Sequence, residues 1–462
     1  MQYQKRIIEA LIRQGKRGDA ARLNNEILKE DSKDPDARAL VASMLLDSGQ
    51  ISKAVSELQD VVNATPNNFV ARYHLGRAHA ARGEWEQARQ QFVEAIRQRQ
   101  DYLPARVALG ELQLSRGEYD TSLQSAGEIL ALNPQSIPGR LMQASALAGL
   151  KKTPEARNVL ETVLKNRPDS AEAWFQLGGL NLAEQKYGPA EDAFRKSYQL
   201  NPSTIRPLVG IAQSYAERNR MADAIEVLTT ESQKRPDRLD LQMSLASFQA
   251  RAGKYDPAIK DLQAALPRVE HKDPKTASEL EFQIGEIYRQ KGDAQNAIYW
   301  LRKAKEFQPD NFAILANLAL LLDATGRAQE ARSLYEESLR KEPDNPIMLN
   351  NLAFLMAQNG GDLDQALTLA QRAKQRLPES QEVSDTLGMI YLQKNLSDSA
   401  LQIFRGLVKD QPNNATFRIH LALALLQKGD KLSARRELQD ALEARPQPAD
   451  TLKIKELMGK IS

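Results

Sequence analysis

The four histidines are the side chains of this sequence best suited to acid–base or metal chemistry, and they stand at positions 74, 79, 271 and 420. His74 and His79 are five residues apart, so a helix would not place them on one face. The chain has no cysteine, which excludes disulfides and thiolate metal sites. It also lacks the GxxxxGKS/T phosphate loop and the HExxH zinc motif. We therefore interpret the histidines as packing and surface residues and predict neither a metal nor a cofactor.

The charged residues give no catalytic signal either. The chain carries 60 acidic and 63 basic residues, and its formal net charge is only +3. Acidic and basic side chains alternate over short stretches, as between Glu84 and Arg89, which is typical of the solvated face of a helix. The balanced charge does not indicate a nucleic acid or an anionic membrane as partner. We predict that the protein is not an enzyme and that it binds a protein or peptide.

The apolar residues do not form a membrane segment. The longest apolar runs, Leu318–Leu322 and Leu421–Leu426, are far shorter than the roughly 20 residues that a membrane helix needs. No apolar signal core follows Met1. We predict a soluble protein without direct membrane insertion, located in the cytoplasm or, if an N-terminal signal was trimmed, in the periplasm. Its oligomeric state is left open.

The stretch from Trp174 to Pro202 shows which elements must position any functional side chain. Its pattern predicts two antiparallel helices joined by a turn at 186–189. Two helices pack closely only where no bulky side chain stands between them, and Gly178 and Ala190 provide such small positions. An asparagine and a proline close the unit.

The same unit recurs along the chain. Closing prolines stand 34 residues apart over long stretches, and five extra residues lie near Leu266–Lys275. The small position of the first helix holds Gly or Ala in twelve of twelve units, and that of the second holds Ala or Ser in thirteen of thirteen. The predicted repeats are 1–34, 35–68, 69–102, 103–136, 137–170, 171–204, 205–238, 239–277 with the insertion, 278–311, 312–345, 346–380, 381–414 and 415–448.

Turn residues and the last segment agree with this division. Residues 449–462 are predicted to form a capping helix, with Leu452, Leu457, Met458 and Ile461 facing the last repeat. Glycines end most first helices, where a left-handed conformation costs glycine little. They are Gly15, Gly49, Gly83, Gly117, Gly253, Gly292, Gly326, Gly361 and Gly429.

These features resemble the tetratricopeptide repeat (TPR). The 34-residue period, both small positions, the closing proline and an aromatic residue in the second helix all match. The tryptophan usually found early in the first helix is present only as Trp174, and Ile8 stands where Gly or Ala is expected. Arginines take the tryptophan position at 72, 106 and 140, and the aromatic residues are Phe92, Phe194, Tyr335 and Phe404. In general character the chain is similar to long bacterial TPR proteins.

The resemblance implies an all-α fold, a right-handed superhelical α-solenoid of about 13 helix pairs with a C-terminal capping helix. It also implies that the first helices line a concave surface. Apolar residues with spaced polar groups on that surface would suit an extended or helical peptide. The candidate peptide-binding residues are Tyr73, Arg77, Phe175, Gln213, Met243, Phe282, Arg289, Asn317, Asn350, Asn351 and Phe354. Alternatively, neighbouring repeats bury these aromatic side chains against each other.

Asn317 and Asn351 stand directly before the Leu–Ala pair of their first helices. In some TPR arrays a ladder of asparagines at this position holds the backbone of an extended peptide, because an amide both donates and accepts hydrogen bonds. Here the ladder is partial, and a purely structural role is the alternative. Other polar residues at the position are His74, Gln176, Gln283, Thr386 and His420. The residue set that captures a C-terminal carboxylate in chaperone-binding TPR domains is incomplete.

Two functions of different classes follow from these observations. The first is a non-enzymatic interaction scaffold that holds a segment of a partner along the concave surface. The second is the targeting part of a larger enzyme, such as a glycosyltransferase, or of a bacterial exopolysaccharide or exosortase assembly. RNA binding by a helical-repeat code fits poorly, because it needs a basic surface.

The helix pairing makes a prediction about stability. Replacing Ala190 by leucine should force the two helices of its repeat apart and cost roughly 1–3 kcal/mol by overpacking. Thermal unfolding of the full chain would measure the loss, and an unchanged melting curve would contradict the predicted register.

Overall fold

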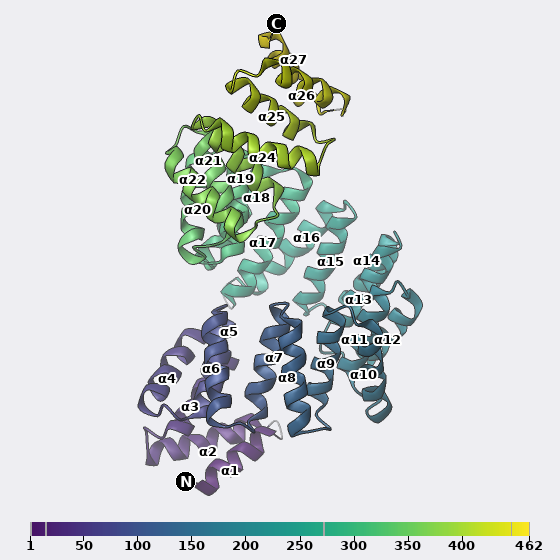
Figure 1. Ribbon diagram of the computed structural model, residues 1–462. Helices are drawn as coiled ribbons and strands as arrows, with labels where there is room; N and C mark the ends of the chain where they lie inside the picture. The colour runs from purple at the N-terminus through teal and green to yellow at the C-terminus, as the bar shows by residue number, and fades with distance from the viewer. Residues whose placement is uncertain (1, 14–15, 271–272, 445, 462) are drawn as a thin grey trace. The chain divides into compact units, whose positions relative to one another are not determined.

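The structure, a computed structural model, describes residues 2–13, 16–270, 273–444 and 446–461 (Figure 1). The described residues form 27 α-helices and one short 3₁₀ helix, η1 (Leu266–Arg268), and no strand. The predicted all-α solenoid class is thereby confirmed. The helices divide into two compact units, Met1–Leu228 and Thr229–Ser462, which are described separately.

In the first unit each helix from α1 to α12 packs against the next one along the chain, and first helices of successive pairs also touch, as α3 touches α5 and α5 touches α7. The helices are α1 (Gln2–Arg13), α2 (Arg17–Glu30), α3 (Pro35–Asp47), α4 (Ile51–Ala64), α5 (Phe69–Ala81), α6 (Trp85–Gln98), α7 (Leu103–Ser115), α8 (Tyr119–Leu132), α9 (Ile137–Gly149), α10 (Thr153–Asn166), α11 (Ala171–Ala183), α12 (Tyr187–Leu200) and α13 (Arg206–Glu217). The next helix, α14 (Met221–Lys234), crosses the boundary between the units.

The second unit continues the pattern with one longer helix. Its helices are α15 (Leu239–Arg251), α16 (Tyr255–Ala265), α17 (Pro274–Lys291), α18 (Ala294–Phe307), α19 (Phe312–Ala324), α20 (Ala328–Lys341), α21 (Pro346–Gln358), α22 (Leu363–Arg376), α23 (Gln381–Gln393), α24 (Ser397–Asp410), α25 (Ala415–Gln427), α26 (Lys431–Glu443) and α27 (Pro448–Ile461). Helix α17 starts four residues before position 278, where its repeat was predicted to begin. The exact repeat boundaries stay predictions.

In most repeats the small position of the first helix faces a bulky side chain of the second helix; Gly110, which meets Met142 of the following first helix, is an exception. A Cβ atom added to Gly178 would lie 2.6 Å from ring carbon Cδ1 of Phe194, so only glycine fits there. Gly76 with Phe92 and Gly388 with Phe404 repeat this arrangement. Where the first helix carries alanine, leucine usually replaces phenylalanine, and these pairs share core clusters: Ala42 with Leu58, Ala144 with Leu160, Ala246 with Leu262, and Ala422 with Leu438.

At the tryptophan position, four residues before the first small position, several side chains donate the same hydrogen bond to the preceding loop. Nε1 of Trp174 donates to the carbonyl oxygen of Pro168, the closing proline of the preceding repeat, at 2.9 Å. Arginine makes the same bond, as from Nε of Arg72 to Pro66 at 2.8 Å. Arg140 with Pro134, Gln242 with Pro236, and Arg418 with Pro412 do so as well. In these repeats the departure from the family pattern preserves the donor, whereas Leu208, Leu315 and Leu349 at the same position have no side chain that can donate.

In the described repeats, the turn after the first helix contains one left-handed residue. Gly49, Gly83 and six other glycines have positive φ there. Four repeats place another residue at the equivalent position, with φ between 58° and 60°: Lys151, Gln185, Asn219 and Asn395. The prediction for Gly361 was wrong, because its neighbour Gly360 takes the left-handed conformation, at φ 69°. Gly15 lies outside the described residues.

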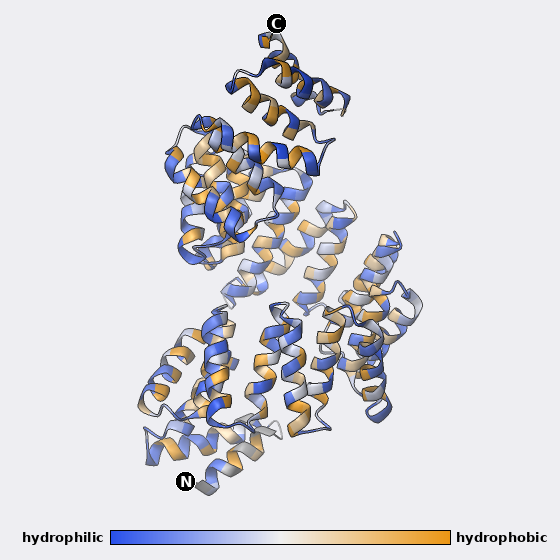
Figure 2. Ribbon diagram, viewed as in Figure 1, coloured by the Kyte–Doolittle hydropathy of each residue, from blue (hydrophilic) through white to orange (hydrophobic). Residues whose placement is uncertain are grey.

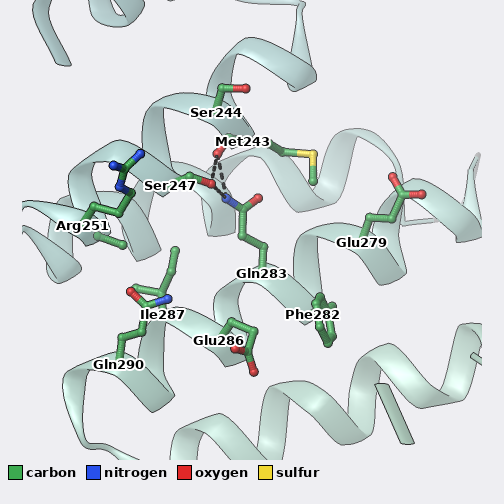
Figure 3. A pocket seen from close by; sticks show the side chains of 11 residues that line it. Met243, Ser244, Ser247, Arg251, Glu279, Phe282, Gln283, Glu286, Ile287 and Gln290 are labelled. Atoms are coloured by element: carbon green, nitrogen blue, oxygen red, sulfur yellow. Dashed lines mark hydrogen bonds between the residues drawn. The ribbon is translucent and has the colours of Figure 1, made fainter. Parts of the chain in front are cut away.

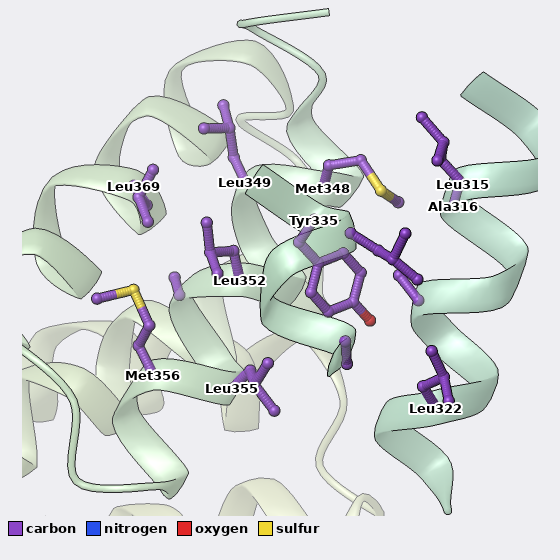
Figure 4. Packing of buried hydrophobic residues seen from close by; sticks show 14 of the residues in the cluster. Leu315, Ala316, Leu322, Tyr335, Met348, Leu349, Leu352, Leu355, Met356 and Leu369 are labelled. Carbon is purple, nitrogen blue, oxygen red and sulfur yellow. The ribbon is translucent and has the colours of Figure 1, made fainter. Parts of the chain in front are cut away.

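The cores are apolar stripes shared between neighbouring pairs of helices (Figure 2). In the largest cluster, Tyr335 of α20 lies between Leu322 of α19 and Leu352 of α21 (Figure 4). At the C-terminal end, α27 packs against α25 and α26 through Ile454 and Leu457. Leu452, predicted to face the last repeat, is instead 70% exposed, because Ile454 lies on the covered face of the helix.

The glycine–phenylalanine pairing predicts a coupled effect on stability. Gly178→Ala should overpack the contact with Phe194 by roughly 1–3 kcal/mol, of which the better helix propensity of alanine returns up to about 1 kcal/mol. In a Phe194→Leu background the same change should stabilise, since this creates the Ala–Leu pair of other repeats. Denaturant unfolding of the four chains would give the coupling energy. Additive effects within about 0.3 kcal/mol would show that the two side chains do not compete for space.

Candidate functional site

An open groove of about 600 Å³ lies between the first helices α15 and α17 in the second unit (Figure 3). Met243 and Phe282, both predicted as candidates, face this groove from opposite helices. Ser247, Arg251, Glu279 and Glu286 surround them. Of the predicted candidates, these two are brought together in one cavity.

Gln283 connects the two helices across the groove (Figure 3). Its Nε2 atom donates to the carbonyl oxygen of Met243 at 2.6 Å and to the hydroxyl of Ser247 at 2.8 Å. Because a carbonyl can only accept, the side-chain amide must turn its NH₂ group toward Met243. The opposite atom, Oε1 of Gln283, is buried and has no hydrogen-bond partner. The link between α15 and α17 therefore leaves one buried acceptor without a donor.

Charged side chains at the groove are paired with near neighbours or placed over a ring. Glu286 forms an ion pair with Arg289 at 2.8 Å, one turn along the same helix. Glu279 lies 4.0 Å from Lys275. The guanidinium carbon of Arg251 is 4.9 Å from the ring centre of Phe248. Exposed pairs of this kind contribute little stability, and a bound segment could displace them at small cost.

The candidates of the first unit are held by their own surroundings. Arg77 pairs with Asp47 at 3.0 Å, and its guanidinium carbon lies 5.9 Å from the ring centre of Tyr73. The ring of Phe175 lies 5.7 Å from that of Phe194 and 4.0 Å from the guanidinium carbon of Arg206. Gln213 donates to Glu217 at 3.0 Å. Burial lowers the pKa of His74 to about 3, so this ring is neutral at pH 7.

The asparagines of the second unit are engaged locally. Nδ2 of Asn317 donates to the carbonyl oxygen of Ala313 in its own helix at 2.8 Å. Asn350 donates to Asn351 at 3.5 Å, which is a long contact, and Oδ1 of Asn350 is buried without a partner. Phe354 stands apart from them, with 40% of its surface exposed.

Some polar side chains directly before the leucine and small residue of a first helix form hydrogen bonds to the preceding repeat, and sequence reasoning missed this. Gln283 does so through Met243 and Ser247, and Nδ1 of His420 lies 2.6 Å from Oδ1 of Asp385 in α23. The signal available was the recurrence of polar residues at this position. The acceptor could not be identified, because it depends on how far successive first helices are offset.

Other kinds of site receive no support from the described part of the chain. It contains no group of three or more His, Asp or Glu side chains placed to hold a metal ion. Within it, no helix combines the length and apolar character needed to span a membrane.

Comparison with protein families agrees with this architecture. Two family models, each described as a tetratricopeptide repeat, match residues 45–112, 288–352 and 324–390, and residues 386–449. Residues 155–276 match a model described as the TPR domain of cytochrome c-type biogenesis protein H. The chain is a tetratricopeptide-repeat protein.

Curated relatives share only part of their length with it. Human superkiller complex protein 3 is 27% identical over 154 residues, which are 33% of this chain and 10% of that protein. The BBSome complex member BBS4 homolog of Drosophila melanogaster is 23% identical over 306 residues, 64% of this chain and 62% of the relative. Human protein O-mannosyl-transferase TMTC1 is 25% identical over 170 residues, which are 37% of this chain and 19% of that protein. The chain thus spans less than two thirds of each relative.

Two solved structures align with nearly the whole chain. One is the APC/C hetero-tetramer Cut9-Hcn1, with a TM-score of 0.42 and 13% identity over 98% of this chain and 95% of that one. The other is Naa15/Naa10 bound to HypK-THB, with a TM-score of 0.32 and 14% identity. The alignment covers 99% of this chain and 96% of that one.

Proposed function

We propose that this chain is a non-enzymatic scaffold that holds an extended or helical segment of a protein partner along the exposed face of its first helices. The observation that carries the proposal is the groove between α15 and α17. There Met243 and Phe282 offer apolar surface, and Gln283 joins the two helices that carry them. A partner that brings an apolar side chain would cover this surface.

Further apolar surface on the first helices supports the same use. Leu320 in α19 and Phe354 in α21 occupy equivalent positions of successive repeats and are 42% and 40% exposed. The candidates other than Met243, Phe282 and Phe354 already contact other residues of the protein. We therefore propose that they contribute less to partner binding than those three. Two curated relatives are named as members of complexes, which is the expected setting for a scaffold.

A second function stays open because of one comparison. Protein O-mannosyl-transferase TMTC1 is named as a transferase, and this chain matches 19% of it. The chain could accordingly serve as the recruiting part of a larger enzyme. In that case the groove would bind a substrate protein, and the proposed chemistry of recognition would be the same.

The proposal predicts which aromatic side chains matter. Short random peptides displayed on phage and selected on the full chain should bind more weakly after Phe282→Ala and after Phe354→Ala, by about tenfold or more each, because each change removes apolar contact area. Fluorescence anisotropy of the selected peptides would measure this.

The matched control is Tyr299→Ala, which removes an aromatic side chain that is 52% exposed on the second helix α18. This change should leave peptide affinity unaltered, and circular dichroism should show the same helix content for all variants. The proposal fails if no peptide is enriched, or if the Tyr299 variant loses as much affinity as the Phe282 variant.

A further inference from the structure

Glu281 is an acidic residue at a core position. It belongs to α17, directly before Phe282, and is only 1% exposed. It occupies the tryptophan position of its repeat, which the next two repeats fill with the fully buried Leu315 and Leu349. Burying an ionised carboxylate costs several kcal/mol unless it is paired and hydrogen-bonded.

No donor compensates Glu281 among the described residues. Its Oε2 atom is buried without a hydrogen-bond partner, and no ion pair within the described part of the chain includes it. Trp174 and Arg72, at the equivalent position, are donors to a closing proline carbonyl. An ionised Glu281 can only accept hydrogen bonds, so it cannot donate to a backbone carbonyl as Trp174 and Arg72 do. The residues just before it belong to the first turns of α17 and not to a loop.

Three charged side chains act on Glu281 from the elements around it. Glu306 and Lys303 belong to α18, and Glu270 follows η1. The Nζ atom of Lys303 lies 5.5 Å from the ring centre of Trp300 and 5.6 Å from that of Tyr299, so aromatic rings hold this cation. The two carboxylates of Glu270 and Glu306 outnumber the single ammonium group of Lys303. The surroundings therefore do not supply a cation that would neutralise an ionised Glu281.

We propose that Glu281 is a proton-dependent switch on the pairing of α17 with α18. The neutral carboxyl group remains in the core, whereas the carboxylate draws water and loosens the N-terminal half of α17. The switch itself is independent of ligand binding. Its effect on the groove rests on the function proposed above, since Phe282 and Gln283 follow Glu281 in the same helix.

The direction of the pH dependence follows from the surroundings. The pKa of Glu281 is raised from 4.5 to about 7, mainly by burial; Lys303 acts to lower it, and the carboxylates Glu270 and Glu306 add to the rise. A raised pKa means that the folded state holds the proton more tightly than the unfolded state. The contribution of this group to stability is therefore complete below about pH 4.5 and is lost as the pH rises through about 7.

Hydrogen exchange on the full chain without any ligand tests the switch. After correction for intrinsic rates, protection of α17 amides should fall by about tenfold or more between about pH 6 and pH 8 in the natural chain. Glu281→Gln keeps the shape but cannot ionise, and its protection should not change over this range. Glu281→Leu, which copies Leu315 and Leu349, serves if the glutamine variant folds poorly.

The control is Glu279→Gln, which removes an exposed carboxylate from the same helix and should retain the natural pH response. The inference is overturned if the Glu281 variants and the natural chain lose protection in parallel. Because no peptide is present, that result would leave the groove function untouched. If peptide selection fails while the Glu281 variants lack the pH response, the switch stands and the groove function does not.

Discussion

The close approach of two antiparallel helices is the contact on which each repeat depends. It requires a residue no larger than alanine where the first helix meets the second, and the side chain opposite must match what is left. Glycine admits phenylalanine at Gly178 and Gly76, and alanine usually meets leucine. Each unit is a stack of these helix pairs. The size of one side chain therefore sets the distance between the two helices of its pair, and the adjacent pairs must pack against that geometry.

Much of the fold could be predicted from the sequence, because the signals are local and repeat many times. The period, the small positions and the turn glycines identify helix pairs without any knowledge of long-range contacts. The errors lie where two local solutions compete. Gly360 and Gly361 could each end α21, and Leu452 and Ile454 are both apolar residues near the start of α27. Packing against the rest of the chain chose between them.

The candidate site was harder to predict, because it depends on the offset between successive first helices. Met243 and Phe282 could be placed on the exposed face by helical spacing alone. The bonds from Gln283 to the preceding helix could not, and they change the interpretation of the polar position. At His420 and Asn317 the same position joins helices or bonds to its own backbone. At Gln283 and Gln176 the amide oxygen is buried without a hydrogen-bond partner.

The exchange of tryptophan for arginine has a consequence for how the array responds to its medium. The indole of Trp174 joins its loop by a neutral hydrogen bond, whereas Arg38 pairs with Glu57, Arg106 with Glu128, and Arg418 with Glu437. Salt screens the attraction between charges more than it weakens a neutral hydrogen bond. Rising ionic strength therefore loosens these arginines from the second helices of their repeats, while the bond from Trp174 to Pro168 changes little.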